Sequence, residues 1–378
     1  MKHLLPGVRV LAVLVFAVAA PAAAPAAANN GALVESFIAR ATDANPRHTE
    51  ADVLVRRDGS LLVAWSDFYA GSRDDAPARI SAAVSSDGGR TWAPRFTLQE
   101  NTGGANVMSV SFVRSRTGDV LFFYLQKNSL TDLKAYVRRS TDDARTWGEP
   151  VLVTADPGYH VMNNARVIQL RSGRLLAPVA STKQVWTKND DFRTSVYLSD
   201  DDGRTWRRSR TLLSAPKRGA MEPGLVELGD GRVMQIIRTQ TGFIWRSFSS
   251  DGGETWTDAA PWDIESPESP ATLAAAPGGD WLLVWNPKVA WGNPEKTVLG
   301  ANHGGARTPL AAMVSGDEGR TWSRPRNLEG NPDSTLAYTS VTFHEGRALL
   351  TYYDFPKGGK LLSLKFTSVP LAWFRALD

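Results

Sequence analysis

Two glutamates, Glu50 and Glu222, stand at matching places in the chain, and both are candidates for acid or base chemistry. Each lies eight residues before a short turn flanked by apolar residues. The same count before the other such turns reaches Ser109, Asn164, Pro270 and Ala337, with Tyr338 beside the last. Most of these residues are polar where a buried strand would be apolar, and unpaired burial of polar groups costs several kcal/mol.

Further polar residues lie close to these positions in sequence, namely Arg47, His48, His160, Asn163 and Arg166. The segment from His160 to Arg166, HVMNNAR, is too polar to begin a buried strand without partners. A wet pocket for a polyol or an acidic ligand accounts for this set of residues. The alternative is that the groups satisfy one another around a water-filled channel.

Short hairpin turns are the elements that must position these residues. There are six, at Asp58-Gly59, Thr117-Gly118, Ser172-Gly173, Asp230-Gly231, Gly278-Gly279 and Glu345-Gly346. Each of the first five is followed by one copy of the pattern S-x-D-x-G-x-T-W, and the copies begin at Ser85, Ser140, Ser199, Ser249 and Ser315. In the second copy Ala144 replaces the glycine. Within each copy, the aspartate can accept bonds from turn amides and the tryptophan anchors the returning strand.

A repeat spacing of about 50 to 65 residues predicts an array of small sheets, which is an all-β propeller of six blades. The sixth unit lacks an S-x-D-x-G-x-T-W copy and therefore an outer strand. Residues 32–41 are the free segment that could supply it. We therefore expect the propeller to close by pairing of its N- and C-terminal strands, because closure removes exposed sheet edges.

Composition limits the partners, the location and the cofactors that the protein can have. The 43 basic and 39 acidic residues nearly balance, and no basic run indicates nucleic acid. Residues 1–28 combine Lys2 and Arg9 with a short apolar run and small residues, which predicts a signal peptide and export to the periplasm or beyond a bacterial cell. Residues 29–378 are then one propeller domain, without a stable membrane span after cleavage, and we expect a monomer. The chain has no cysteine, and its five histidines are scattered, so we expect neither metal nor cofactor.

The repeated pattern resembles the Asp boxes of the sialidase (neuraminidase) superfamily, and the whole mature chain resembles its bacterial six-bladed propellers. By that resemblance, Glu222 at the start of its strand and Arg238 at the end of the next match a family glutamate and arginine. Arg307, shortly before the last Asp box, matches a further arginine. Tyr338 is similar in position to the family's nucleophile, and Asp75, with Asp74 as its neighbour, lies where the acid/base aspartate is found.

The resemblance implies a retaining hydrolysis of a terminal acidic sugar, with sialic acid as the default. Tyr338 would attack, Glu222 would take its proton, and Asp75 would protonate the leaving oxygen and later activate water. A neutral tyrosine avoids the repulsion of about 4 kcal/mol that a carboxylate nucleophile would meet 4 Å from the sugar carboxylate. Arg238 and Arg307 would hold that carboxylate by paired hydrogen bonds.

One family feature is absent from its expected place. The superfamily opens its first blade with Arg-Ile-Pro, whereas alignment on the Asp58-Gly59 turn places residues 49–51, Thr-Glu-Ala, there. Arg47 or Arg166 could complete an arginine triad. Glu50 has no counterpart in the family pattern, and it could bind sugar hydroxyls or act as a carboxylate catalyst.

Two other functions fit the same residues. One is a lyase acting on a uronate-containing glycan, with Tyr338 or His160 as base, and the other is a carbohydrate-binding propeller without catalysis. The segment from Asn286 to Arg307 is the longest stretch without strand character, and we expect a flap on the pocket rim that brings Trp291 and His303 to the sugar.

Overall fold

A computed structural model describes residue 1 and residues 31–187, 190–287 and 306–375 of the chain. Contacts separate residues 1–31 from residues 32–378, and the second unit carries the fold. The predicted signal peptide, residues 1–28, lies outside the described residues except for Met1. The described part contains one short helix, η2 (Leu371–Arg375), and no helix in it is both long and apolar enough to span a bilayer.

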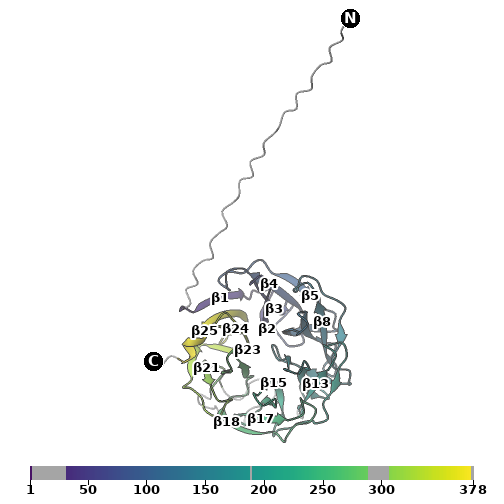
Figure 1. Cartoon of the computed structure of the whole chain (residues 1–378), viewed down its shortest axis with the longest axis vertical. Coiled ribbons are helices and arrows are strands. Elements are labelled where there is room, and N and C mark those ends of the chain that lie inside the picture. The colour runs from purple at the N-terminus through teal and green to yellow at the C-terminus, as the bar shows by residue number, and fades with distance from the viewer. Residues whose placement is uncertain (2–30, 188–189, 288–305, 376–378) are drawn as a thin grey trace. The chain divides into compact units, whose positions relative to one another are not determined.

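The strands of residues 32–378 form five hydrogen-bonded sheets (Figure 1). The first contains β2 (Arg47–Val55), β3 (Leu61–Phe68), β4 (Ala78–Ser85) and β5 (Phe96–Gln99). Another contains β15 (Met221–Glu227), β16 (Val233–Arg238), β17 (Phe243–Ser249) and β18 (Ala260–Glu265). The next contains β19 (Thr272–Ala275), β20 (Trp281–Trp285), β21 (Leu310–Ser315) and β22 (Arg326–Glu329).

The largest sheet has nine strands. Its first group is β6 (Asn106–Arg114), β7 (Val120–Lys127), β8 (Leu133–Ser140) and β9 (Val151–Leu152). Its second group is β10 (Tyr159–Val161), β11 (Ile168–Gln169), β12 (Leu175–Thr182), β13 (Arg193–Ser199) and β14 (Arg207–Arg208). Only the parallel pairing of Tyr159 with Leu133 joins the groups. The ladders therefore define five sheets, although the six predicted turns each lie between two paired strands.

The N-terminal strand completes the last sheet, as the sequence predicted. β1 (Val34–Ala39) pairs antiparallel with β25 (Ser363–Pro370), from Val34 opposite Ser368 to Ala39 opposite Leu364. The same sheet continues through β24 (Arg347–Pro356) to β23 (Ser334–His344). In Figure 1, β2, β15 and β23 lie on the inner side of this unit, and β2 contacts both β6 and β23. The first strands of the sheets therefore converge.

The five Asp boxes form closely similar turns. In the copy at Ser85, the serine hydroxyl donates to Asp87 and accepts from the amide of Gly89, while Asp87 accepts from the amide and hydroxyl of Thr91. The same bonds recur in the other four copies, including the one in which Ala144 replaces glycine.

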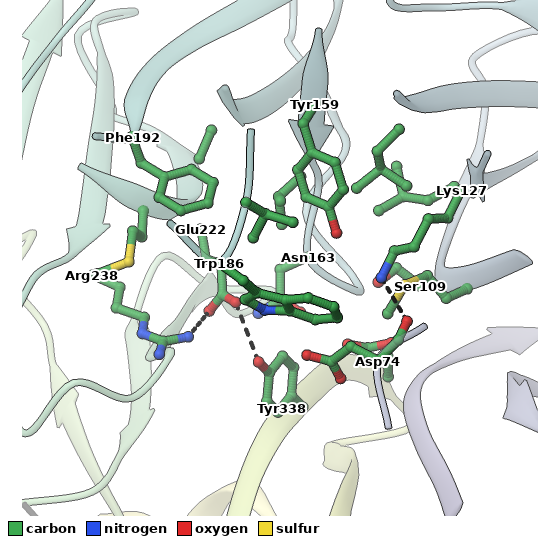
Figure 2. Close-up of a pocket in the computed structure, with 18 of the residues that line it drawn as sticks. Asp74, Ser109, Lys127, Tyr159, Asn163, Trp186, Phe192, Glu222, Arg238 and Tyr338 are labelled. Atoms are coloured by element: carbon green, nitrogen blue, oxygen red, sulfur yellow. Dashed lines mark hydrogen bonds and ion pairs between the residues drawn. The ribbon is translucent and has the colours of Figure 1, made fainter. Parts of the chain in front are cut away.

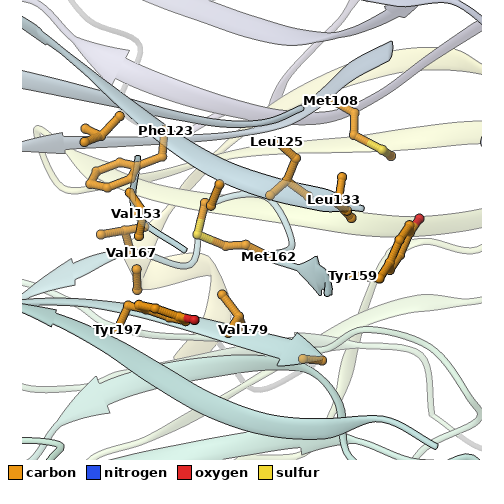
Figure 3. Close-up of a cluster of buried hydrophobic side chains, with 14 of the residues drawn as sticks. Met108, Phe123, Leu125, Leu133, Val153, Tyr159, Met162, Val167, Val179 and Tyr197 are labelled. Carbon is orange, nitrogen blue, oxygen red and sulfur yellow. The ribbon is translucent and has the colours of Figure 1, made fainter. Parts of the chain in front are cut away.

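The closing tryptophans of the boxes anchor the core between sheets. Each packs against a different apolar cluster, and they are Trp92, Trp147, Trp206, Trp256 and Trp322. The cluster beside Trp206 joins β6–β8 to β10–β13 and includes Phe123, Met162 and Tyr197 (Figure 3). The packing is thus spread between neighbouring sheets, and it leaves the converging strand ends free to carry polar groups.

Candidate functional site

A cavity of about 550 Å³ opens where the inner strands converge (Figure 2). Five of the predicted site residues line it, namely Arg47, Glu50, Glu222, Arg238 and Tyr338. The other charged lining residues are Arg73, Asp74, Lys127 and Arg218. An apolar wall faces them and includes Met108, Leu133, Val161, Trp186 and Phe192. The cavity can therefore hold a ligand that has both charged and apolar parts.

The same backbone feature, a β-bulge, orients four of the lining residues. Antiparallel ladders shift register at the cavity ends of β2, β6, β15 and β23. Within these bulges the residues with positive φ are Glu50 at 56°, Ser109 at 55°, Glu222 at 39° and Tyr338 at 59°. Left-handed backbone at a residue other than glycine costs about 1–3 kcal/mol, and it persists where the surroundings enforce it. The bulges therefore turn four side chains toward one space.

Tyr338 and Glu222 form the centre of the site. The Tyr338 hydroxyl donates to Glu222 Oε1 at 3.2 Å, and Arg238 Nη1 donates to Glu222 Oε2 at 2.6 Å. On its other side, Arg238 Nη2 donates to Glu268 Oε1 at 3.3 Å. Glu268 also binds Arg218 at 3.2 Å. Oppositely charged groups thus alternate from the cavity wall to the tyrosine.

Charge and burial act in opposite directions on this pair. Although burial alone would raise the pKa of Glu222, the adjacent Arg238 holds it below its usual range, so the carboxylate is ionised. Burial and the charge of Glu222 together raise the pKa of Tyr338. The resting state is therefore a neutral tyrosine beside an ionised carboxylate that can accept the tyrosine proton.

Asp74, rather than its neighbour Asp75, lines the cavity. Arg47 pairs with the Asp74 carboxylate. Burial would raise the pKa of Asp74, but the positive charges of Arg47 and Lys127 hold it below its usual range. Asp75 instead pairs with the exposed Arg73 at 3.0 Å and is absent from the cavity lining. The loop that the sequence identified therefore reaches the site through a different aspartate.

Glu50 is a buried carboxylate to which no arginine or lysine is bonded among the residues that the structure describes. Its Oε2 accepts a hydrogen bond from Ser66 at 3.1 Å. Burial raises the pKa of Glu50 to about 6, because the opposing effect of Arg47 is smaller. Glu50 can therefore change its charge near neutral pH, unlike Glu222.

Three predicted substrate-binding residues lie behind the cavity wall. Asn164 donates through Nδ2 to the carbonyls of Ala51 at 2.7 Å and Tyr338 at 3.0 Å, so it bridges two bulges. Arg166 donates to the carbonyl of Ala271 at 2.9 Å and to Thr272. Burial lowers the pKa of Arg166 to about 10. Asn164 and Arg166 thus bond other parts of the protein, and both residues brace the site from behind the cavity wall.

Arg307 is the third of these residues. It donates to the hydroxyl of Tyr353 at 2.9 Å and to the carbonyl of Glu268 at 3.1 Å, and its guanidinium lies 5.7 Å from the ring centroid of Tyr338. It is therefore in contact with the Tyr338 ring but does not line the cavity. The predicted flap, with Trp291 and His303, lies outside the described residues for the most part.

Sequence reasoning missed several lining residues. Arg218 lies four residues before Glu222, so closeness to a known strand start was an available signal. Lys127 ends β7 and Trp186 lies in the connection between β12 and β13, so counting back from hairpin turns does not reach either residue. No group of three or more histidine, aspartate or glutamate side chains suited to a metal ion occurs within the described ranges.

The amino-acid sequence is similar to those of known proteins. Residues 59–350 match the model of the BNR repeat-like domain family. A sialidase of Micromonospora viridifaciens is 26% identical over 357 residues, which cover 87% of this chain and 52% of the relative. The chain spans 52% to 59% of the length of four curated sialidases that it matches.

Solved structures share the fold at low identity. A Dyadobacter fermentans protein of unknown function has a TM-score of 0.71 at 17% identity, covering 89% of this chain and 99% of that one. The Hadza microbial sialidase Hz136 has a TM-score of 0.68 at 20% identity, covering 88% of this chain and 67% of that one. These similarities establish a propeller-like all-β fold.

Proposed function

Because the chain belongs to the BNR repeat-like domain family, within the sialidase superfamily, we propose that it is an exo-acting glycoside hydrolase that releases a terminal acidic sugar, sialic acid by default. The observation that carries the proposal is the 3.2 Å hydrogen bond from Tyr338 to a carboxylate whose second oxygen is held by Arg238. This pairing activates a neutral hydroxyl, which can approach an anionic sugar without like-charge repulsion.

The proposed reaction retains configuration through two displacements. The Tyr338 oxygen bonds to the anomeric carbon as its proton passes to Glu222, while Asp74 gives a proton to the departing glycosidic oxygen. Asp74 then takes a proton from water, the water oxygen replaces the tyrosine oxygen, and Glu222 returns its proton to Tyr338. Asp74 replaces Asp75 in this role because Asp74 lines the cavity.

The negative charge of an acidic sugar would complement the positive charges of the cavity arginines. Arg238 bonds Glu222, and Arg47 pairs with Asp74, which lies on the other side of Tyr338 from Arg238 (Figure 2). A sugar carboxylate near Arg47 would compete for its positive charge. The pKa of Asp74 would then rise, and the aspartate would carry the proton that the first step requires. Arg307 would act through its contact with the Tyr338 ring rather than on the substrate.

The finer architecture is part of the same proposal. We count the nine-stranded sheet as two blades joined by one bridge, which gives six blades in total. Residues 1–28 would direct export to the periplasm or the medium of a bacterium, and the mature domain would act as a monomer on glycans.

The test is release of sugar from an aryl α-sialoside and from an α-sialyl disaccharide by purified residues 29–378. Tyr338→Phe and Glu222→Gln should each lower kcat by on the order of 10³-fold or more on both substrates. Asp74→Asn should impair the disaccharide more than the aryl glycoside, because a poor leaving group needs its proton more. Asp75→Asn is the matched control and should remain close to wild type.

Two results would redirect the proposal. An unsaturated product with new ultraviolet absorbance from a uronate-containing glycan would identify a lyase. Binding of a sialoside by a well-folded wild type that never turns it over would identify a carbohydrate-binding propeller.

A further inference from the structure

The loop that carries Asp74 connects β3 to β4 and reaches over the cavity from the first sheet. Its own backbone bonds are few, from Tyr69 N to the carbonyl of Pro77 at 3.2 Å and from Ala76 N to the carbonyl of Arg73 at 3.0 Å. These two bonds close the loop on itself without fixing it relative to the nine-stranded sheet. Its position over the cavity therefore depends on side chains from other elements.

Two buried donors from the nine-stranded sheet converge on one atom of this loop. Lys127 Nζ donates to the Asp74 carbonyl oxygen at 2.6 Å, and Asn106 Nδ2 donates to the same oxygen at 2.9 Å. Asn106 also donates to the carbonyl of Ala76 at 2.8 Å. The two donors face each other as cross-strand partners at the ends of β6 and β7. Lys127 is 1% exposed and Asn106 is fully buried.

Burying a lysine to hydrogen-bond a carbonyl costs free energy, because the ammonium group loses much of its hydration. The rings of Tyr159 and Trp186 partly compensate, each with its centroid 5.7 Å from Nζ. An asparagine alone could satisfy the Asp74 carbonyl. The charge of Lys127 therefore has an electrostatic consequence for the carboxyl groups around it, beyond the hydrogen bond that it makes.

We propose that Lys127 and Asn106 are positioning residues that pin the Asp74 loop over the cavity, and that the Lys127 charge sets the pH range in which Asp74 can donate its proton. The inference rests on the proposed hydrolysis for the role of Asp74, and on the hydrogen bonds alone for the pinning. The pinning places the carboxylate, while Arg47 binds it and the Ser72 carbonyl at 3.1 Å.

The direction of the pH effect follows from charge. Arg47, Lys127 and, farther away, Arg307 favour the ionised form of Asp74, whereas Glu50 is a further negative group in the same cavity. A general acid must be protonated in the substrate complex, so the alkaline limb of the kcat profile reports its pKa there. Removal of the Lys127 charge raises that pKa and moves the limb to higher pH.

Three variants separate pinning from charge. Lys127→Met removes both the bond and the charge, Asn106→Leu removes a bond without changing charge, and Lys127→Arg keeps the charge. Lys134→Met is the matched control, because Lys134 also donates to the backbone carbonyl of an aspartate, Asp156, but lies outside the cavity lining. Two readouts are needed: kinetics on the sialyl disaccharide across pH, and hydrogen exchange of the peptide covering residues 69–77.

Lys127→Met should lower kcat by about 10- to 100-fold with little change in KM, and it should move the alkaline limb upward by about one unit. Asn106→Leu should lower kcat without moving the limb, and Lys127→Arg should keep the limb in place. Both Lys127→Met and Asn106→Leu should speed exchange in residues 69–77, while Lys134→Met should change neither readout. If Lys127→Met does not fold, Asn106→Leu and Lys127→Arg still test the two roles separately.

The outcomes are distinguishable from failure of the proposed hydrolysis. A rise in KM with an unmoved limb would mean that Lys127 contacts substrate, and unchanged exchange in residues 69–77 would remove the pinning. Both results overturn the inference even if the wild type is an active sialidase. Conversely, faster exchange in a protein without hydrolase activity would uphold the pinning and reject the proposed function.

Discussion

Left-handed backbone in the Asp boxes and at the cavity bulges falls on different residues. In each Asp box two consecutive residues have a positive φ; the second is glycine in four copies, at 78° to 92°, whereas the first is Asp143, Asp202 or Glu318 in three copies. At the cavity it falls on glutamate, serine and tyrosine, as in Glu222 at 39° and Tyr338 at 59°. Glycine relieves strain where the turn only has to fold. The cavity bulges keep the strain because a side chain is needed there.

The difference extends to how each region is held. An Asp box is closed by short-range bonds among its own eight residues, as Asp87 and Thr91 show. A cavity bulge is held from across the molecule, for example by Asn164, which bonds the backbone of Ala51 and Tyr338. Local closure makes the boxes independent repeats. Long-range bracing makes the cavity a single unit, so a change at one bulge reaches the others.

The largest expected effect comes from placing a side chain in a relaxed turn. A Cβ on Gly89 would lie 2.0 Å from the ring of Phe366, in addition to the backbone strain at a φ of 86°. Gly89→Ala should lower the free energy of unfolding by about 3 kcal/mol, measured by urea denaturation.

Gly59→Ala is the control for backbone strain alone, because nothing lies within 4 Å of its Cβ position at a φ of 81°. It should cost about 1 kcal/mol. Equal losses in the two variants would show that the ring contact contributes nothing.

The next largest effect concerns the ionisation of Glu50, which lies at one of the cavity bulges. Glu50 has a pKa of about 6 when folded, against 4.5 for an ordinary glutamate. Its burial therefore destabilises the fold progressively as pH rises from 4.5 to 6, and the loss is complete above that window. Glu50→Gln should be more stable than wild type by about 2 kcal/mol at pH 7.5, and that gain should shrink at pH 4.5.

Urea titrations of both proteins at the two pH values measure this difference. A gain for Glu50→Gln that is the same at both pH values would show that the ionisation of Glu50 is not its source.

Ser109 offers a bulge without a proposed catalytic group. Ser109→Gly should raise the free energy of unfolding by about 0.5 to 1 kcal/mol, because glycine accepts the φ of 55° without strain. Ser111→Gly, two residues along the same strand in ordinary ladder pairing, should instead destabilise. If Ser109→Gly also destabilises, the bulge is not strained and the comparison fails.

We expect the smallest change in stability at Ala144, which is a non-glycine residue with positive φ, as at the cavity, but lies in an Asp box. Ala144 carries a positive φ of 64° in an Asp box, so Ala144→Gly should relieve strain. The methyl group is also part of an apolar cluster, which limits the gain to about 0.5 kcal/mol. Ala135→Gly, in the extended strand β8, is the control and should lower the melting temperature, whereas Ala144→Gly should raise it slightly.

The fold followed from the sequence where the signals were local. Turn dipeptides and Asp boxes lie within eight residues and depend on short bonds, so the hairpins and the pairing of residues 34–39 with the C-terminal strand were predictable. The joining of two strand groups through Tyr159 and Leu133 was not, since a single bridge leaves no pattern in the sequence.

The site followed only in part. Counting back from turns found Glu50, Glu222 and Tyr338 because a repeated bulge places them. The choice between Asp74 and Asp75 depends on which way a loop is held, and the holding residues, Asn106 and Lys127, come from another sheet. Asp74 and Asp75 have the same side chain and adjacent positions, so only tertiary contacts decide which of them lines the cavity.

The pairing of β1 with β25 has a consequence for how the chain is made. Val34 is synthesised long before Ser368, yet the two residues are partners. Contacts between such distant residues form late, because a long loop must close before they contribute. The last sheet therefore cannot be completed until Ser368 has been synthesised, and until then β1 of the nascent chain lacks its partner strand.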